Sequence, residues 1–458
     1  MQSIFAIAWL TWKAALRFKL FLVIAVLLIG AVVGLPLVIK DDGTAQGFTQ
    51  IILTYTLGAI TLLLGISTLW LSCGTLARDV EECQMQVVAT KPVARWQIWV
   101  GKWLGIMSLN AVLLAVTGAC VGGLLVWRSH KLPPDQQKIL REQVLVARGS
   151  AKPPDMRAEI DQKTEIILQG RLKNSPVDKV DVPEVRRQIR EGVKADYQLA
   201  LPSYFYIWKI DLGHAQNRLR GQPLRLRVKF NTPQLTASGT TYLALWLVGD
   251  PPKWQSEPMS LAPDTFHEFQ IPPDLFDAQG ILTVAFVNQN NTALLFPLNE
   301  SMEVLYPQGG FALNFVRGLL IIWFWMGMVA ALGLMAASYL SFPVASFFSM
   351  AIMLVFLSSG MLAETVESGS VAAGAEEGQA GHSVADVVLI PAFKGVIAVV
   401  GLATHHSPIA ALSSGRSITW GELGLAFLEI VVLFAGLMSL VGIILFSRRE
   451  LATAQGTQ

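Results

Sequence analysis

The chain contains few charged residues and few cysteines for its length. Of its 458 residues, 15% are charged and 3 are cysteines. An average soluble domain carries about 25% charged residues, so the composition excludes a disordered chain and an ordinary cytosolic protein. The cysteines show neither zinc-type nor haem-type spacing. A hydrophobic content of 53% and a mean hydropathy of +0.49 instead indicate a membrane protein.

Sequence motifs for nucleotide binding and for hydrolysis are also missing. The chain has no G-x-x-x-x-G-K-[ST] phosphate loop, no G-x-S-x-G and no H-E-x-x-H. The net charge of +2 indicates no nucleic-acid partner. The adjacent pair His405-His406 has no carboxylate cluster beside it. We therefore expect that the chain binds no cofactor or metal itself and is not an enzyme.

The charged residues are concentrated in one region. Residues 128–310 hold 22 of the Lys and Arg residues and 20 of the Asp and Glu residues. This region interrupts an otherwise apolar chain, so it predicts a water-facing module inserted into a membrane protein. All the cysteines lie outside it, so the module contains no disulfide.

Six apolar segments are long enough to cross a bilayer, which needs about 20 residues. Basic residues mark the cytoplasmic side: Arg78, Lys91 and Arg95 lie between spans two and three, and Arg448 follows the last span. Both termini are then cytoplasmic, in a cytoplasmic (inner) membrane. The predicted spans are 20–39, 50–76, 101–127, 311–340, 344–362 and 422–446. They define three membrane regions, 20–127, 311–362 and 421–447, the first of which contains the cytoplasmic segment 77–100. Residues 448–458 form a cytoplasmic tail.

Two further segments lie at the membrane surface. Residues 1–19 mix tryptophans with Lys13 and Arg17, which favours an interfacial amphipathic helix over a simple extension of span one. Residues 363–420 form an external loop. Its apolar stretch 387–403 is short and contains Pro391 and Lys394, so it predicts an interfacial or re-entrant helix rather than a seventh span.

The polar module divides into two parts. Residues 128–203 show helical spacing at 136–147 and 155–172. Residues 204–310 alternate with period two, as in Leu224–Phe230, where apolar and basic side chains point to opposite faces. This favours an antiparallel β-sandwich of jelly-roll type. Further strands are expected at 241–248, 266–271, 281–287, 294–298 and 302–306.

Three tryptophans in this sandwich are candidates for sugar stacking. Trp208 and Trp246 lie in predicted strands, and a core position is the favoured interpretation for both. Trp254 lies in a predicted loop beside Pro251-Pro252, so it is the better ligand candidate.

The segment between spans two and three carries the most specific pattern. A short predicted helix begins with the acidic segment Arg78-Asp79-Val80-Glu81-Glu82. It ends at the basic turn Lys91-Pro92-Val93-Ala94-Arg95, and the next span begins with Gly101-Lys102. This order resembles the type-2 permease subunits of ABC transporters, with Ala94 in place of a small hydroxyl residue. The C-terminal Phe446–Glu450 is also similar to that family. The resemblance covers the six spans but not the module.

The resemblance implies a transport subunit that works with a separate ATPase. A second permease subunit pairs with the first, as a homodimer or heterodimer, and ATP and Mg²⁺ are bound by the ATPase. The turn that contains Ser341 and Pro343 is the second, smaller ATPase contact. The residues that the resemblance assigns to ATPase coupling are Asp79, Glu81, Glu82, Lys91, Pro92 and Arg95, although Lys91 and Arg95 can also reflect membrane topology alone.

Three charged residues lie in or beside the predicted spans. Glu429 is inside the last span, Glu422 is at its outer edge on the same face, and Arg317 is near the start of span four. A charge within the membrane is costly unless it is paired or faces a cavity. We expect Glu429 to face the bundle interior and to pair with Arg317.

The sequence therefore predicts an α-helical polytopic membrane protein with six transmembrane helices and an inserted α+β extracytoplasmic module. The preferred function is the permease subunit of an ABC exporter, whose module gates the exit, binds substrate or docks an envelope partner. The alternative is a membrane-anchored binding or scaffold protein whose sandwich recognises a glycan or an envelope partner.

Overall fold

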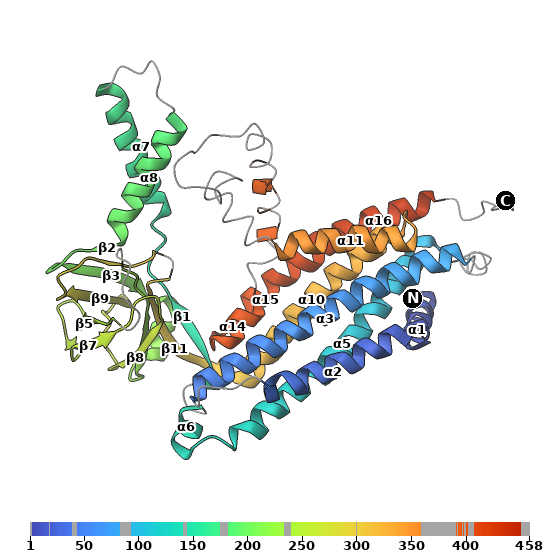
Figure 1. Cartoon of the computed structure of the whole chain (residues 1–458), viewed down its shortest axis with the longest axis horizontal. Coiled ribbons are helices and arrows are strands. Elements are labelled where there is room, and N and C mark those ends of the chain that lie inside the picture. The colour runs from blue at the N-terminus through green and yellow to red at the C-terminus, as the bar shows by residue number, and fades with distance from the viewer. Residues whose placement is uncertain are drawn as a thin grey trace. The chain divides into compact units, whose positions relative to one another are not determined.

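A computed structural model shows a mostly helical chain with antiparallel β-sheets (Figure 1). It divides into two compact units, one formed by Met1–Ala147 with Gly309–Gln458 and the other by Arg148–Gln308. The predicted module limits, 128–310, are therefore wider than the compact unit. The structure describes residues 2–17, 19–38, 44–82, 93–140, 144–174, 182–232, 240–298, 300–358 and 407–449, and scattered positions between 391 and 401.

Among the described residues, the first unit contains four helices that are long and apolar enough to cross a membrane. They occupy four of the six predicted spans, and they indicate a membrane protein. The spans are Thr49–Glu81 within α3 (Ala45–Glu81), α5 (Arg95–Ser129), α10 (Phe311–Ala337), and Trp420–Arg448, which combines α15 (Trp420–Ala426), the π-helical segment η3 (Phe427–Ala435) and α16 (Gly436–Arg448).

Two apolar helices at the other predicted spans are shorter. They are α2 (Lys19–Val38), in which the side chains of Val23–Pro36 are described, and α11 (Phe342–Leu357). Pro36 lies inside α2 and Pro343 lies in the first turn of α11, where a missing N–H costs little. The structure thus places helices at all six predicted positions, and over the described residues four of them are candidate membrane spans.

The N-terminal helix α1 (Gln2–Arg17) packs along α5. Gly101 and Gly105 allow this approach, because a Cβ atom at either position would lie 2.8 Å from Ile7 or Thr11. The Trp12 indole also donates to Ser108 Oγ at 2.8 Å. The other face of α1 exposes large apolar side chains, namely Phe5, Trp9, Leu10 and Leu16.

Helix α10 is the central element of the first unit. It packs against α3, α5, α11, η3 and α16, and also against the short helix α14 (Pro408–Ser413). Its buried face is rich in small residues, including Ala330, Ala331 and Gly333. A Cβ atom on Gly333 would lie 1.9 Å from Ser72 Oγ, so only glycine allows this crossing with α3. The first unit also contains α6 (Pro134–Ile139).

The second unit contains a pair of charged helices, α7 (Arg157–Asn174) and α8 (Val182–Gln198). They pack through a small apolar cluster that includes Ile160, Leu168 and Ile189. The helix predicted at 155–172 is confirmed. The helix predicted at 136–147 is wrong at its C-terminal end, because Val146–Ala151 forms strand β1, which pairs with β11.

Strands of the second unit form two larger antiparallel sheets and a two-stranded sheet. From β3 to β5 the chain alternates between the larger sheets, because β3 and β5 lie in one and β4 lies in the other, whereas β5, β6 and β7 follow one another in the same sheet. The four-stranded sheet has the order β1 (Val146–Ala151), β11 (Met302–Gly310), β4 (Leu224–Val228), β8 (His267–Ile271). The five-stranded sheet has the order β3 (Phe205–Asp211), β9 (Ile281–Asn288), β5 (Tyr242–Val248), β6 (Trp254–Gln255), and β7 (Met259–Leu261) also pairs with β5. In the two-stranded sheet, β10 (Leu294–Leu295) pairs with β2 (Leu199–Ala200). Between β3 and β4 the chain forms η2 (Gly213–Ala215) and α9 (Gln216–Leu219).

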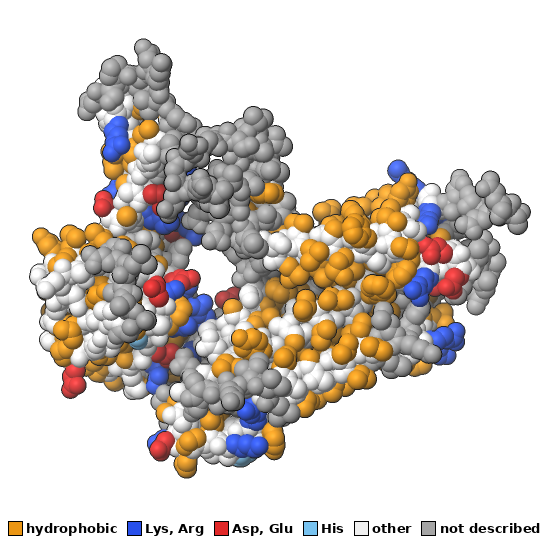
Figure 2. All heavy atoms as spheres, viewed as in Figure 1, with side chains coloured by type: hydrophobic (Ala, Val, Ile, Leu, Met, Phe, Trp, Pro, Cys, Tyr) orange, Lys and Arg blue, Asp and Glu red, His pale blue; other side chains and the backbone are white. Residues whose placement is uncertain are grey.

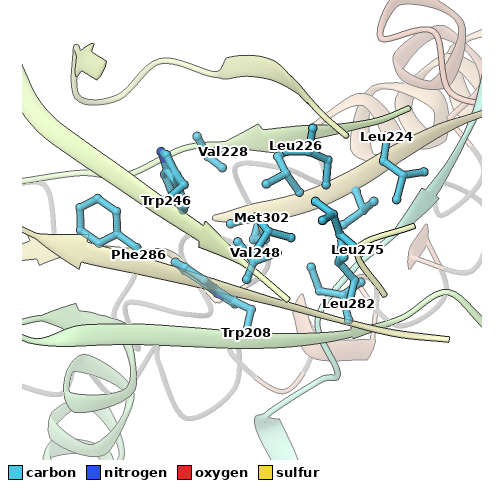
Figure 3. Close-up of a cluster of buried hydrophobic side chains, with 14 of the residues drawn as sticks. Trp208, Leu224, Leu226, Val228, Trp246, Val248, Leu275, Leu282, Phe286 and Met302 are labelled. Carbon is cyan, nitrogen blue, oxygen red and sulfur yellow. The ribbon is translucent and has the colours of Figure 1, made fainter. Parts of the chain in front are cut away.

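The two larger sheets share one hydrophobic core, as in a β-sandwich (Figure 3). Leu224, Leu226 and Val228 of β4 are fully buried, and Arg225 and Arg227 lie on the opposite face. The alternation predicted for this strand is confirmed. Trp208 and Trp246 are 5% and 0% exposed, so both are core residues, whereas the half-buried Trp254 lies in β6 rather than in a loop.

We predict that Trp246→Ala destabilises the sandwich by about 3–5 kcal/mol, because it leaves a large cavity in the core. Limited proteolysis of the full chain in detergent should then show new cleavage sites within residues 205–308. The matched control is Trp254→Ala, which removes the same side chain from a half-buried edge position. Equal protease resistance in both variants would contradict this account of the core.

We also predict that the sandwich loses stability at alkaline pH. Burial raises the pKa of Tyr206, whose hydroxyl donates to the Tyr197 carbonyl. Folding therefore favours the neutral phenol, so stability is constant below the ordinary pKa and falls as pH rises through about 10. Tyr206→Phe should reduce the fall in melting temperature between about pH 9 and 11, measured by calorimetry of the full chain.

Candidate functional site

Charged side chains gather at the ends of the membrane helices, whereas hydrophobic side chains cover their length on the face shown in Figure 2. One such end is formed where α3 ends, α5 and α11 begin, and α10 and α16 end. We call this region the helix-end cluster, and it consists of Arg78, Asp79, Glu81, Arg95, Lys102 and Arg449. Asp79, Glu81 and Arg95 were predicted to take part in ATPase coupling.

A buried ion pair joins α3 to α5 in this cluster. Lys102 is 6% exposed, and its Nζ lies 2.5 Å from Asp79 Oδ2. The same ammonium donates to the Thr75 carbonyl at 2.7 Å. Because a charge removed from water needs such partners, the pair fixes the position of Asp79 at the end of α3.

Arginine side chains satisfy the carbonyl groups at the ends of two other helices. Arg95 Nη1 donates to the carbonyls of Phe446, Ser447 and Arg449, at 3.0, 2.8 and 2.7 Å. Arg449 Nη1 in turn lies 3.3 Å from the carbonyls of Ala337 and Ser338 at the end of α10. A cation at a helix C-terminus also interacts favourably with the helix dipole. Arg95 therefore braces the bundle, a role that its sequence pattern did not indicate.

The segment at the end of α3 contacts the turn before α11. Glu81 Oε1 accepts a hydrogen bond from the Phe342 backbone N–H at 2.9 Å. The Arg78 guanidinium lies 4.4 Å from the centroid of the Phe342 ring. These contacts bring together two segments, at 77–100 and at 341–345, that were predicted separately as cytoplasmic contacts.

The remaining residues predicted for coupling are exposed or lie outside the described part of the chain. Glu82 is exposed and follows the last residue of α3. Ser341 precedes α11 and Pro343 lies in its first turn, and both are exposed. Lys91 and Pro92 lie outside the described residues, as do His405 and His406.

Arg317 contacts partners other than Glu429, the partner that the sequence predicted for it. Arg317 Nη1 donates to the Ile418 carbonyl at 2.8 Å, and its guanidinium lies 4.4 Å from the Trp420 ring centroid. Glu422 forms a capping box at the start of α15: its carboxylate accepts from Thr419 N at 2.7 Å, and its own N–H donates to Thr419 Oγ1. Glu429 lies in the π-helical segment η3 and is half-buried.

The sequence analysis missed a second charged cluster, which lies on one face of the four-stranded sheet. Arg227 on β4 is opposite Glu303 on β11 and Glu268 on β8. Glu303 is 4% exposed, and the Ser150 hydroxyl donates to its carboxylate. Arg148 and Arg225 both pair with Glu268. The alternation in β4 indicated that Arg225 and Arg227 share a face, but their partners are far away in the sequence.

Among the residues that the structure describes, no group of His, Cys, Asp or Glu side chains could hold a metal ion. Comparison with protein-family models, with curated proteins and with solved structures finds no match to this chain. The function is therefore inferred from the geometry and from the sequence pattern.

We predict that Asp79→Ala destabilises the helix bundle, because the Lys102 ammonium stays buried with only the Thr75 carbonyl. The loss should be about 3 kcal/mol, at the low end for a broken buried pair because Asp79 is partly exposed. A lower melting temperature of the full chain in detergent would show it, and Asp79→Leu with Lys102→Met should recover part of the loss.

The control for this prediction is an exposed pair of similar distance. Arg190 Nε lies 2.9 Å from Asp161 Oδ1, and both side chains are about half exposed. Asp161→Ala should therefore cost less than about 1 kcal/mol. If Asp79→Ala is as mild as Asp161→Ala, the Lys102–Asp79 pair does not hold α3 to α5.

Proposed function

We propose that this chain is the membrane-spanning permease subunit of an ABC exporter driven by a separate ATPase. In this proposal α2 and α11 also cross the membrane, which gives six spans with both termini in the cytoplasm. The membrane is the cytoplasmic (inner) membrane. A second permease subunit completes the pathway, and ATP and Mg²⁺ are bound by the ATPase. The chain itself then catalyses no reaction.

The contact between Glu81 and the Phe342 N–H carries this proposal. A transporter driven by an external ATPase needs the cytoplasmic ends of several helices to move together, as near-rigid bodies. This hydrogen bond and the Arg78–Phe342 contact link the end of α3 to the start of α11. A push on the segment after α3 would therefore reach two helices at once.

The helix-end cluster suggests a division of roles among the coupling residues. Asp79 and Arg95 are engaged within the chain, with Lys102 and with the end of α16. We infer that these two position the segment, whereas the exposed Glu82 and Lys91, which lies later in the same segment of the sequence, meet the ATPase. This revises the expectation that Arg95 itself holds that contact.

The module lies outside the cytoplasm in this proposal. Its charged face is internally paired, and its core tryptophans are not free to stack on a sugar. The alternative function, a membrane-anchored binding or scaffold protein, has one observation in its favour. Phe205 and Ile207 on the edge strand β3 are 61% and 56% exposed, which is typical of a partner-binding surface.

The proposal predicts that an ATPase co-purifies with the full chain from mild-detergent membranes. The double charge reversal Glu82→Lys, Lys91→Glu should reduce its recovery by about tenfold or more, equivalent to about 1.4 kcal/mol of binding. Mass spectrometry should identify a chain with the phosphate loop that this protein lacks.

The matched control reverses two exposed charges on α6, as Asp135→Lys with Lys138→Glu, which lie on the other side of the membrane in this proposal. This variant should retain the ATPase. If no ATPase is recovered with the wild-type chain at equal expression, the transport proposal fails. The anchored-binding function would then be preferred.

A further inference from the structure

An apolar groove of about 720 Å³ lies between α5 and α10. Small residues line it on α5, including Ala115, Ala119 and Gly122, and bulky residues line it on α10, including Phe315 and Leu319. None of the described residues that line it carries a charged side chain. The groove therefore offers dispersion contacts to an apolar occupant.

Two reciprocal hydrogen bonds hold the helices together where the groove ends. Trp103 Nε1 donates to the Gly327 carbonyl at 3.0 Å, and Trp323 Nε1 donates to the Met107 carbonyl at 2.9 Å. Trp323 also lines the groove. Since its only polar atom is already bonded, this end presents an aromatic surface without a free donor.

The length of the groove distinguishes between a lipid chain and a helix. On α10 the lining runs from Phe311 to Trp323, which is about 18 Å at 1.5 Å per residue. The hydrocarbon core of a bilayer is about 30 Å thick, so the groove matches roughly one leaflet. A spanning helix of a second copy would continue well beyond the groove, whereas a lipid chain ends near the bilayer centre.

Residues just beyond the other end of the groove are suited to the membrane surface. Trp127 is 51% exposed, and Lys131 Nζ lies 4.1 Å from its ring centroid. Tryptophan and lysine are typical of the headgroup region, where the ammonium complements a lipid phosphate. The groove thus runs from a cationic surface to the middle of the membrane.

We propose that this groove binds one acyl chain of a membrane phospholipid, in the leaflet that meets the end of α5 and the start of α10. The inference requires only that these two helices cross the membrane. It does not depend on transport, so the pull-down above can fail without affecting it.

Two adjacent glycines provide a matched pair of variants. Neither Gly122 nor Gly123 has any atom within 4 Å of the position that a Cβ would occupy, so both tolerate a side chain. Gly122 lines the groove and Gly123 does not. Gly122→Leu should fill the groove, and Gly123→Leu should change helix propensity equally without filling it.

The test uses the full chain in bilayers that contain a phosphatidylcholine with a diazirine near the end of one acyl chain. After illumination, mass spectrometry should find label on groove residues such as Leu319 and Leu320, several-fold above the exposed face of α16 at Leu437 and Leu440. Gly122→Leu should lower the groove labelling several-fold, and Gly123→Leu should leave it unchanged.

Three results would overturn the proposal. One is equal labelling of the groove and of α16 in the wild-type chain, and this result does not depend on the folding of any variant. Another is labelling that Gly122→Leu does not reduce. The third is a covalent dimer formed in high yield from a photoreactive amino acid at Ala119, which would show that a second copy occupies the groove.

Discussion

Backbone carbonyls at the end of a helix have no partner within that helix, and at a membrane boundary each of them needs one. In this chain arginine side chains from other helices supply partners. Arg95 at the start of α5 serves the end of α16, and Arg449 beyond α16 serves the end of α10. The Lys102–Asp79 pair adds the end of α3. The helices are thus joined in a series at one end, from α3 to α5, from α5 to α16 and from the residue after α16 to α10.

In this series the charged residues have a different structural role from the one that their sequence pattern suggests. Arg95 and Asp79 look like surface residues in a charged segment between two spans. In the structure each is committed to another helix, so a substitution there would alter the bundle before it altered any partner. Loss of function in an Arg95 variant would therefore not by itself locate an interface.

The sequence predicted those features that depend on local periodicity. The helices at the six apolar segments, the helix at 155–172 and the alternation of Leu224–Val228 are all found in the structure. Features that depend on distant contacts were missed. Val146–Ala151 forms a strand because β11 lies beside it, and Arg317 donates to the distant Ile418 carbonyl. The Asn314 side chain also bonds to the segment before α15, donating to the Arg416 carbonyl and accepting from Ile418 N. No local sequence pattern reveals these contacts.

The strands that open and close the sandwich are neighbours in one sheet. The chain enters through β1 and leaves through β11, and these strands are hydrogen-bonded to each other. Gly149 and Tyr306 are so close that a Cβ on the glycine would lie 2.2 Å from the tyrosine ring. A domain whose two ends meet in this way can be gained or lost between helices with little disturbance to them. Evolution could therefore have added this sandwich to an existing membrane protein in one insertion, and a short hairpin in its place should leave the helical unit able to fold.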